Sequence, residues 1–145
     1  MAGSAGGAGS SCKLLVPGKS LACVSIGMTQ AQVRAVAGAP RSTTKVTGCC
    51  GQVISFVYPQ FTVSFMRGHV RWVFSTSRLY RTANGVGIGS TKAQLLARVQ
   101  GVRCGVFGLA KTFCIAGKAF DDPKQTLFAL PNGRVVLARL GFQPE

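Results

Sequence analysis

Few side chains in this sequence belong to the types that perform acid–base or metal chemistry. The chain contains one histidine, His69, and three acidic residues, Asp121, Asp122 and Glu145. General acid–base catalysis needs a positioned carboxylate or imidazole, and a catalytic zinc ion needs about three protein ligands. Adjacent residues of a strand point to opposite faces, so Asp121 and Asp122 form a poor pair for a glycosidase. We therefore expect no enzymatic activity, no metal site and no cofactor.

Cysteines are the other residues that could do chemistry, and they stand at Cys12, Cys23, Cys49, Cys50, Cys104 and Cys114. An even number in a small chain, without a Cys-x-x-Cys zinc knuckle, favours disulfides and an oxidising compartment. We expect a local bridge between Cys104 and Cys114. The other four are expected to join Cys12 and Cys23 to Cys49 and Cys50, in either order. A Cys12–Cys23 bridge is less favoured because it would leave only the strained vicinal pair, which is also the one candidate for a redox centre.

The overall charge restricts the class of protein. Lys and Arg number 17 in 145 residues, for a formal net charge of +14, yet 47% of the residues are hydrophobic. A disordered polybasic tail would be poorer in apolar residues, and no apolar run approaches the roughly 20 residues of a membrane span. We expect a folded, strongly basic protein that binds polyanions nonspecifically. In a cell envelope, the same charge would suit an anionic polymer or lipid surface.

The N-terminal segment is rich in Gly, Ala and Ser. We expect residues 1–22 to form a flexible tail. A secretory signal has an apolar central region, and none is visible in residues 1–11. The cysteines nevertheless predict an extracytoplasmic location, either secreted or associated with the envelope.

An internal repeat organises the rest of the chain. Residues 26–32 read IGMTQAQ and residues 88–94 read IGSTKAQ. Thr29 with Gln32, and Thr91 with Gln94, each match the capping box that begins a helix. A glycine follows each expected helix, at residues 38 and 101, where a left-handed cap is easily formed. The sequence therefore predicts two short helices in equivalent positions.

Three strand-like segments follow each expected helix, rich in β-branched and aromatic residues and separated by turn residues. They are residues 52–58, 61–67 and 69–77 in the first copy, and 111–116, 124–130 and 134–140 in the second. We predict an α+β fold of two tandem helix–β-meander repeats, residues 23–77 and 88–142, joined by a linker at 78–87. Their antiparallel sheet is expected to carry both short helices on one face.

Alternation along the first three segments predicts which face of the sheet is packed. The packed face would carry Ile54, Phe56, Tyr58, Phe61, Val63, Phe65, Val70, Trp72 and Phe74. The open face would show Ser55, Thr62, Ser64, Met66, Arg71 and Ser75. We predict a binding surface made of Ser55, Thr62, Ser64, Met66 and Arg71 together with Arg78, Tyr80 and Arg81 at the edge.

The first copy carries a recognisable set of short motifs. It has Gly-Met-Thr-Gln-x-Gln-Val at residues 27–33, Gly-x-Pro at 38–40, Phe-Val-Tyr at 56–58, Val-x-Phe at 63–65 and Gly-x-Val at 68–70. This pattern resembles the BamE (SmpA/OmlA) family of small envelope proteins, which bind other envelope proteins. In tandem, the unit is similar to the β-lactamase-inhibitor-protein fold, whose curved sheet grips a partner. The resemblance implies a partner-binding envelope module, with the target unassigned.

Two functions follow as hypotheses. The first is noncatalytic binding of a protein partner through the open sheet face. The alternative is a basic nucleic-acid-binding protein, in which Arg67, Arg71, Arg78 and Arg81 contact phosphates while Trp72 and Tyr80 stack on bases. The segment GVGIGSTK at residues 85–92 lacks the Gly-Lys-Ser/Thr order of a P-loop, so we interpret it as a turn into the second helix.

Overall fold

Two short helices begin at the predicted capping boxes. The computed structural model describes residues 12–49, 51–105, 113–117 and 123–141, including α1 (Gln30–Ala37) and α2 (Lys92–Arg98). Thr29 Oγ1 accepts a hydrogen bond from the Gln32 N–H at 3.2 Å, and Gln32 Oε1 accepts one from the Thr29 N–H at 2.9 Å. Thr91 and Gln94 form the same pair of bonds. Both predicted helix starts are confirmed.

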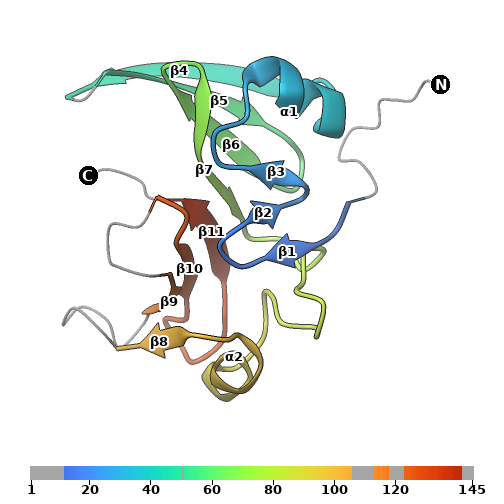
Figure 1. Cartoon of the computed structure of the whole chain (residues 1–145), viewed down its shortest axis with the longest axis vertical. Coiled ribbons are helices and arrows are strands. Elements are labelled where there is room, and N and C mark those ends of the chain that lie inside the picture. Colours follow the sequence, from blue (N-terminus) through green and yellow to red (C-terminus); the bar gives the residue numbers. More distant parts are fainter. Residues whose placement is uncertain (1–11, 50, 106–112, 118–122, 142–145) are drawn as a thin grey trace.

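The main body of the molecule is one antiparallel sheet of eight strands (Figure 1). The strands are β4 (Ser42–Gly48), β5 (Gly51–Val57), β6 (Thr62–Met66), β7 (His69–Ser75), β8 (Val102–Cys104), β9 (Phe113–Ala116), β10 (Thr126–Ala129) and β11 (Leu137–Gly141). Their order is β4-β5-β6-β7-β11-β10-β9-β8. Pairing of β7 with β11 therefore joins the strands that follow α1 to those that follow α2.

A second, smaller sheet forms from residues near the N-terminus. It contains β1 (Leu15–Val16), β2 (Ser20–Leu21) and β3 (Val24–Ser25), paired in chain order. β1 and β2 lie within the segment that the composition predicts as a tail. Leu15, Leu21 and Val24 are fully buried, so this sheet contributes to the core of the protein.

The predicted fold class is wrong. The described chain is mostly β, with an eight-stranded and a three-stranded sheet and two short helices, rather than an α+β pair of helix–β-meander repeats. Within the described ranges, four strands follow each helix, because β4 and β8 precede the predicted ones. Every side chain of β4 is exposed, so the strand lacks the alternation of buried apolar residues that reveals a strand in a sequence. β8 has only three residues.

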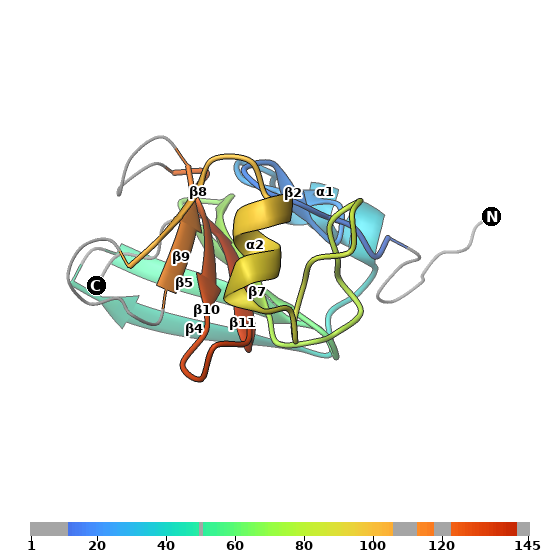
Figure 2. The same cartoon turned by 90° about the horizontal axis from the view of Figure 1, so that it is seen from below.

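The hydrophobic core lies between one face of the large sheet and the elements that cover it. α1 and β1–β3 lie on the same side of the sheet (Figures 1 and 2). Phe56 from β5 and Phe65 from β6 meet edge to face, with ring centroids 4.7 Å apart. Val33 of α1 and Leu95 of α2 belong to the same core cluster. The burial of these side chains anchors helices that are too short to be stable alone.

The cysteine pairing agrees with the prediction in one bridge and differs in another. Cys104 and Cys114 are bonded, as predicted. Cys12 is bonded to Cys23, so the predicted bridges from these two residues to Cys49 and Cys50 are wrong. β1 and β2 fold the chain back on itself, which brings Cys12 beside Cys23, with their Cα atoms 5.9 Å apart. Cys49 is also disulfide-bonded, and Cys50 lies outside the described residues.

Candidate binding groove

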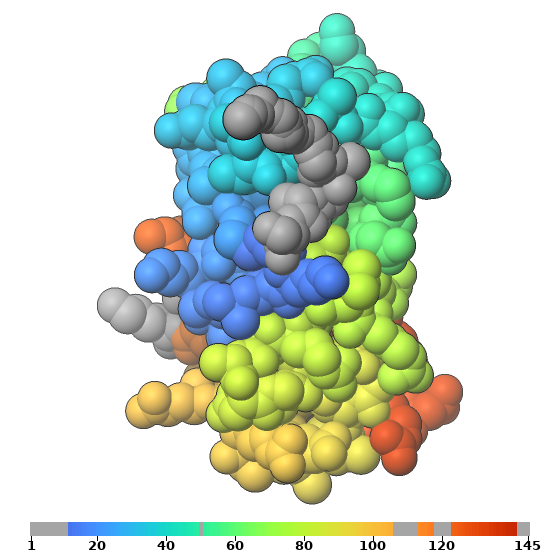
Figure 3. All heavy atoms as spheres, turned by 90° about the vertical axis from the view of Figure 1, so that its right-hand side faces the viewer, coloured from blue at the N-terminus to red at the C-terminus, as the bar shows by residue number. Residues whose placement is uncertain are grey.

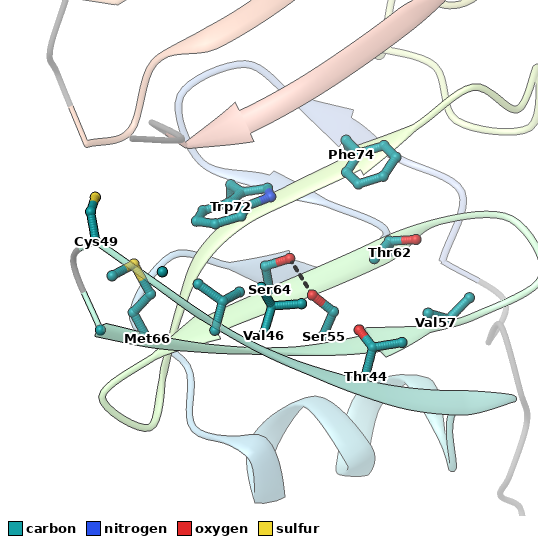
Figure 4. Close-up of a pocket in the computed structure, with 13 residues that line it drawn as sticks. Thr44, Val46, Cys49, Ser55, Val57, Thr62, Ser64, Met66, Trp72 and Phe74 are labelled. Atoms are coloured by element: carbon teal, nitrogen blue, oxygen red, sulfur yellow. Dashed lines mark hydrogen bonds between the residues drawn. The ribbon is translucent and has the colours of Figure 1, made fainter. Parts of the chain in front are cut away.

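A groove of about 500 Å³ lies on the face of the sheet opposite α1 (Figure 4). We call it the β4–β7 groove. Its lining comes from four consecutive strands and the turn between the first two: Thr44, Val46, Gly48, Cys49, Gly51, Val53, Ser55, Val57, Thr62, Ser64, Met66, Trp72 and Phe74. Aliphatic, aromatic and hydroxyl-bearing side chains share this surface, and the described lining contains no charged residue.

About half of the residues that line the groove come from β5 and β6, where side chains alternate strictly between the two faces of the sheet. Phe56, Val63 and Phe65 are buried in the core, so their neighbours Ser55 and Ser64 point to the opposite face. The two serine hydroxyls are hydrogen-bonded across the strands at 2.8 Å, on the floor of the groove (Figure 4). The structure thus brings together four of the predicted open-face residues, namely Ser55, Thr62, Ser64 and Met66.

A β-bulge in β7 turns the side chains of Trp72 and Phe74 toward the groove. Ser64 lies opposite Trp72, whereas the next residue of β6, Phe65, lies opposite Val70. Arg71 is therefore the extra residue, and it reverses the facing of every later residue of β7. Val73 enters the core cluster, while Trp72 and Phe74 line the groove. The prediction that Trp72 and Phe74 share the packed face is wrong for this reason.

The same bulge turns Ser75 away from the groove face and into the interior. The alternation predicts Ser75 on the open face, which is wrong: Ser75 is 2% exposed and donates a hydrogen bond to the Gln60 carbonyl oxygen at 2.7 Å. β4, which was not predicted, adds Thr44 and Val46 to the groove. The β-branched residues of STTKVTG are the signal that could have indicated this strand.

The remaining predicted residues lie away from the groove. Arg71 is exposed. Tyr80 is 3% exposed and packs edge to face on Phe61, with ring centroids 5.7 Å apart, and burial raises the pKa of its phenol. Arg78 and Arg81 belong to the segment that leads to α2, and they are not part of the groove lining.

The described residues show no cluster of three or more His, Cys, Asp or Glu side chains that could hold a metal ion. His69 is exposed at the start of β7, where its Nδ1 lies 3.1 Å from the Arg67 carbonyl oxygen. Asp121, Asp122 and Glu145 lie outside the described residues. Within the described ranges, no helix is long and apolar enough to cross a membrane.

Positive charge dominates the surface of the described chain. Of the 17 Lys and Arg residues, only Lys111 and Lys118 lie outside the described residues, so fifteen are described. No acidic side chain stands among the described residues to neutralise them. The described lining of the groove is uncharged, in a protein whose described residues carry positive charge only.

No protein-family model matches the chain, and no curated protein or solved structure is significantly similar to it. The resemblance to the BamE and β-lactamase-inhibitor-protein folds receives no support from these comparisons.

Proposed function

We propose that the protein is a noncatalytic binding module that holds a protein partner in the β4–β7 groove. The observation that carries this proposal is the placement of Trp72 and Phe74 on the groove side of β7 by the bulge at Arg71. Aromatic side chains in a hollow are typical anchors of protein interfaces; Phe74 is half-buried and Trp72 is 7% exposed, so Phe74 offers the larger aromatic area to a partner. Hydroxyl groups of Thr44 and Thr62 supply hydrogen bonds at the same surface.

The chemistry of the groove defines the partner. Its apolar lining favours an inserted segment with aliphatic or aromatic side chains. The net positive charge of the protein favours an acidic partner, which would accelerate association at low salt. The partner we propose is therefore an acidic protein with a protruding apolar loop.

Disulfide bonding supports the proposed location. The Cys12–Cys23 and Cys104–Cys114 bridges are consistent with an extracytoplasmic protein. We propose that the protein acts in the secreted space or at the cell envelope, where its partner would also reside.

Two neighbouring substitutions on β4 test the groove. Val46 is 62% exposed and lines the groove, whereas Thr47 is exposed on the opposite face of the same strand. Val46→Lys places a charge in the groove, and Thr47→Lys adds the same charge outside it. The immobilised wild-type protein, V46K and T47K are each incubated with an extracytoplasmic fraction and washed at high salt, and bound proteins are identified by mass spectrometry.

We expect a discrete acidic protein to remain bound to the wild type and to T47K and to be lost from V46K. Its affinity for V46K should fall about tenfold or more, because a charge buried without a partner opposes binding. Equal retention by all three proteins, or the absence of any salt-resistant partner, would contradict the proposal.

Nucleic-acid binding is the second candidate, favoured by fifteen described Lys and Arg residues without an acidic side chain among them. Binding of this kind releases counterions, so its affinity falls steeply with salt concentration. It would survive Val46→Lys, which adds a positive charge. Fluorescence anisotropy of a labelled oligonucleotide at several salt concentrations separates this behaviour from salt-resistant protein binding.

A further inference from the structure

Arginine side chains surround the glycine-rich loop at residues 85–89, which leads into α2. The Arg81 side chain donates from Nε to the Gly85 carbonyl oxygen at 3.2 Å. Its Nη1 donates to the carbonyl oxygens of Ile88 at 3.2 Å and Arg78 at 3.3 Å. The Arg81 guanidinium therefore bonds to carbonyl oxygens both before the loop, at Arg78, and within it, at Gly85 and Ile88.

Two more guanidinium groups meet at Gly89. Arg134, from the turn before β11, donates from Nη1 to the Gly89 carbonyl oxygen at 2.9 Å. The guanidinium of Arg78 lies directly beside the Gly89 Cα, because a Cβ built there would come 3.2 Å from Arg78 Cζ and closer still to its Nη1. Three positive groups thus converge on five residues of backbone. Figure 3 shows this segment of the chain, in yellow-green, on the surface between the N-terminal residues and α2.

Glycine is required at two positions for this approach. A Cβ at Gly87 would lie 2.5 Å from the Tyr80 carbonyl oxygen and 3.3 Å from Arg81 Nη1. A Cβ at Gly89 would collide with the Arg78 guanidinium, and its φ of +95° also disfavours other residues. The sequence Gly-Ile-Gly therefore lets the arginines lie against the main chain.

The three arginines keep unused donors and lack a negative partner among the described residues. A guanidinium carries five N–H groups and stays charged at every physiological pH. Arg78 donates none of its side-chain N–H groups to a described residue, and Arg81 keeps both N–H groups of Nη2. No described carboxylate balances these three charges, so an anion that met several of them would form charge-assisted hydrogen bonds.

The turn itself does not need the arginines, as the matching turn of similar sequence before α1 shows. Gly27 N–H donates to the Val70 carbonyl oxygen, and Val70 N–H donates to that of Met28. Gly89, Val135 and Ser90 form the equivalent pair of bonds in the second copy. At the position of Arg134, however, the first copy has His69, whose ring contacts the Arg67 carbonyl oxygen. The arginines are therefore an addition to a turn that forms without them.

We propose that Arg78, Arg81 and Arg134 form a binding site for a tetrahedral oxyanion of the phosphate class, either free or as a phosphate ester. A planar carboxylate satisfies one guanidinium fork, whereas the oxygens of a phosphate can accept from several guanidiniums that approach from different directions. The carbonyl groups of the loop hold Arg81 and Arg134 in place before the anion arrives, which lowers the entropy lost on binding. This site is separate from the β4–β7 groove and does not depend on the function proposed for it.

Titration monitored by amide NMR tests the site. Inorganic phosphate, glycerol 3-phosphate and acetate are added separately to the full chain at constant ionic strength, with chloride as the balancing ion. We expect saturable shifts of the Gly85, Gly87 and Gly89 amide signals with phosphate, and no such shift at Gly27 of the first copy. Binding of glycerol 3-phosphate as tight as that of phosphate would identify an ester site, and weaker binding would identify a site for the free ion.

Two matched variants distinguish phosphate binding at this site from nonspecific attraction to the net positive charge of the protein. Arg78→Gln removes an arginine without a described hydrogen bond, so the fold should be retained, and we expect phosphate affinity to fall about tenfold, the effect of one charge-assisted hydrogen bond. Arg41→Gln removes the same charge from another exposed position and should leave the affinity unchanged. Equal losses in both variants, no saturable shift, or acetate binding as tightly as phosphate would overturn the proposal.

Discussion

Arg71 decides which side chains of β7 reach the β4–β7 groove. Without an inserted residue, Val70, Trp72 and Phe74 would face the core together, as the alternation of the sequence indicates. The register shift beside Ser64 and Phe65 leaves Arg71 exposed and turns Trp72 and Phe74 toward the groove. A single residue thus converts two apparent core positions into candidate binding positions.

Tyr58 and Tyr80 are the two tyrosines of the chain, and both are buried beside Phe61. Loss of solvent raises the pKa of both phenols, and for Tyr58 the nearby Arg34 partly opposes the rise. The Tyr58 hydroxyl also donates a hydrogen bond to the Gly38 carbonyl oxygen at 2.8 Å. The neutral form of each ring is therefore the form that the folded state favours.

Alkaline titration should reveal this preference. Because the folded state raises both pKa values above 10.0, it holds the phenol protons more tightly than the unfolded state does. The resulting stability is complete below pH 10 and is lost as the pH rises through the folded-state pKa values. We expect absorbance at 295 nm to titrate at a higher pH in the folded protein than in guanidinium chloride. Coincident titration curves would contradict the assignment, and Tyr80→Phe isolates the contribution of Tyr58.

Among the elements, the three-stranded sheet shows how short strands become part of a core. Each of β1, β2 and β3 has two residues, too few for an independent sheet. The Leu15 N–H donates to the Arg81 carbonyl oxygen at 2.9 Å, and the Gly18 N–H donates to Thr126 Oγ1 at 2.7 Å. These two bonds attach the small sheet to the segment before α2 and to β10, while the Cys12–Cys23 bridge joins the two ends of the β1–β2 hairpin.

Removal of the Cys12–Cys23 bridge should test how much this covalent link within the small sheet stabilises the protein. In the chain-entropy model, a bridge across 11 residues contributes about 3 kcal/mol by restricting the unfolded chain. We expect the double variant Cys12→Ser/Cys23→Ser to lose about that amount of unfolding free energy in a guanidinium chloride titration. Cys104→Ser/Cys114→Ser, across 10 residues, is the matched comparison and should lose a similar amount. A loss below about 0.5 kcal/mol for the first variant would show that the small sheet does not depend on its bridge.

On the scale of the whole molecule, charge is the dominant property. A net charge of +14 in 145 residues repels itself in the compact state, and the repulsion is partly relieved when the chain unfolds. The described surface offers no carboxylate to balance the arginines and lysines. Stability should therefore depend on the ionic strength of the solution.

Thermal unfolding at several salt concentrations checks this dependence. Raising the NaCl concentration from about 0.05 M to 0.5 M shortens the Debye length from roughly 14 Å to 4 Å, so repulsion between surface charges is screened. We expect Tm to rise by about 2–4 °C, the shift that corresponds to about 1 kcal/mol in a chain of this size. A Tm that stays constant or falls with added salt would show that self-repulsion is not a significant term. Equal osmolarity of sucrose serves as the control for nonspecific solvent effects.

Local patterns account for the parts of the fold that could be predicted. The capping boxes at Thr29 and Thr91 involve residues three apart, so their hydrogen bonds can be predicted from the sequence. The Cys104–Cys114 bridge spans ten residues and connects the paired strands β8 and β9. Alternation within β5 and β6 correctly placed Ser55, Thr62, Ser64 and Met66 on one face. Each of these features depends on neighbours along the chain.

The sequence by itself determined the helix starts and the facing of β5 and β6, because each depends on interactions within a few residues, and its composition determined the excess of positive charge. Only the tertiary structure decided the facing of β7, the addition of the exposed strand β4, the pairing of Cys12 with Cys23, and the meeting of Arg78, Arg81 and Arg134 at one loop. These features depend on register between strands and on contacts between distant segments, whose free energies are settled by packing over the whole molecule.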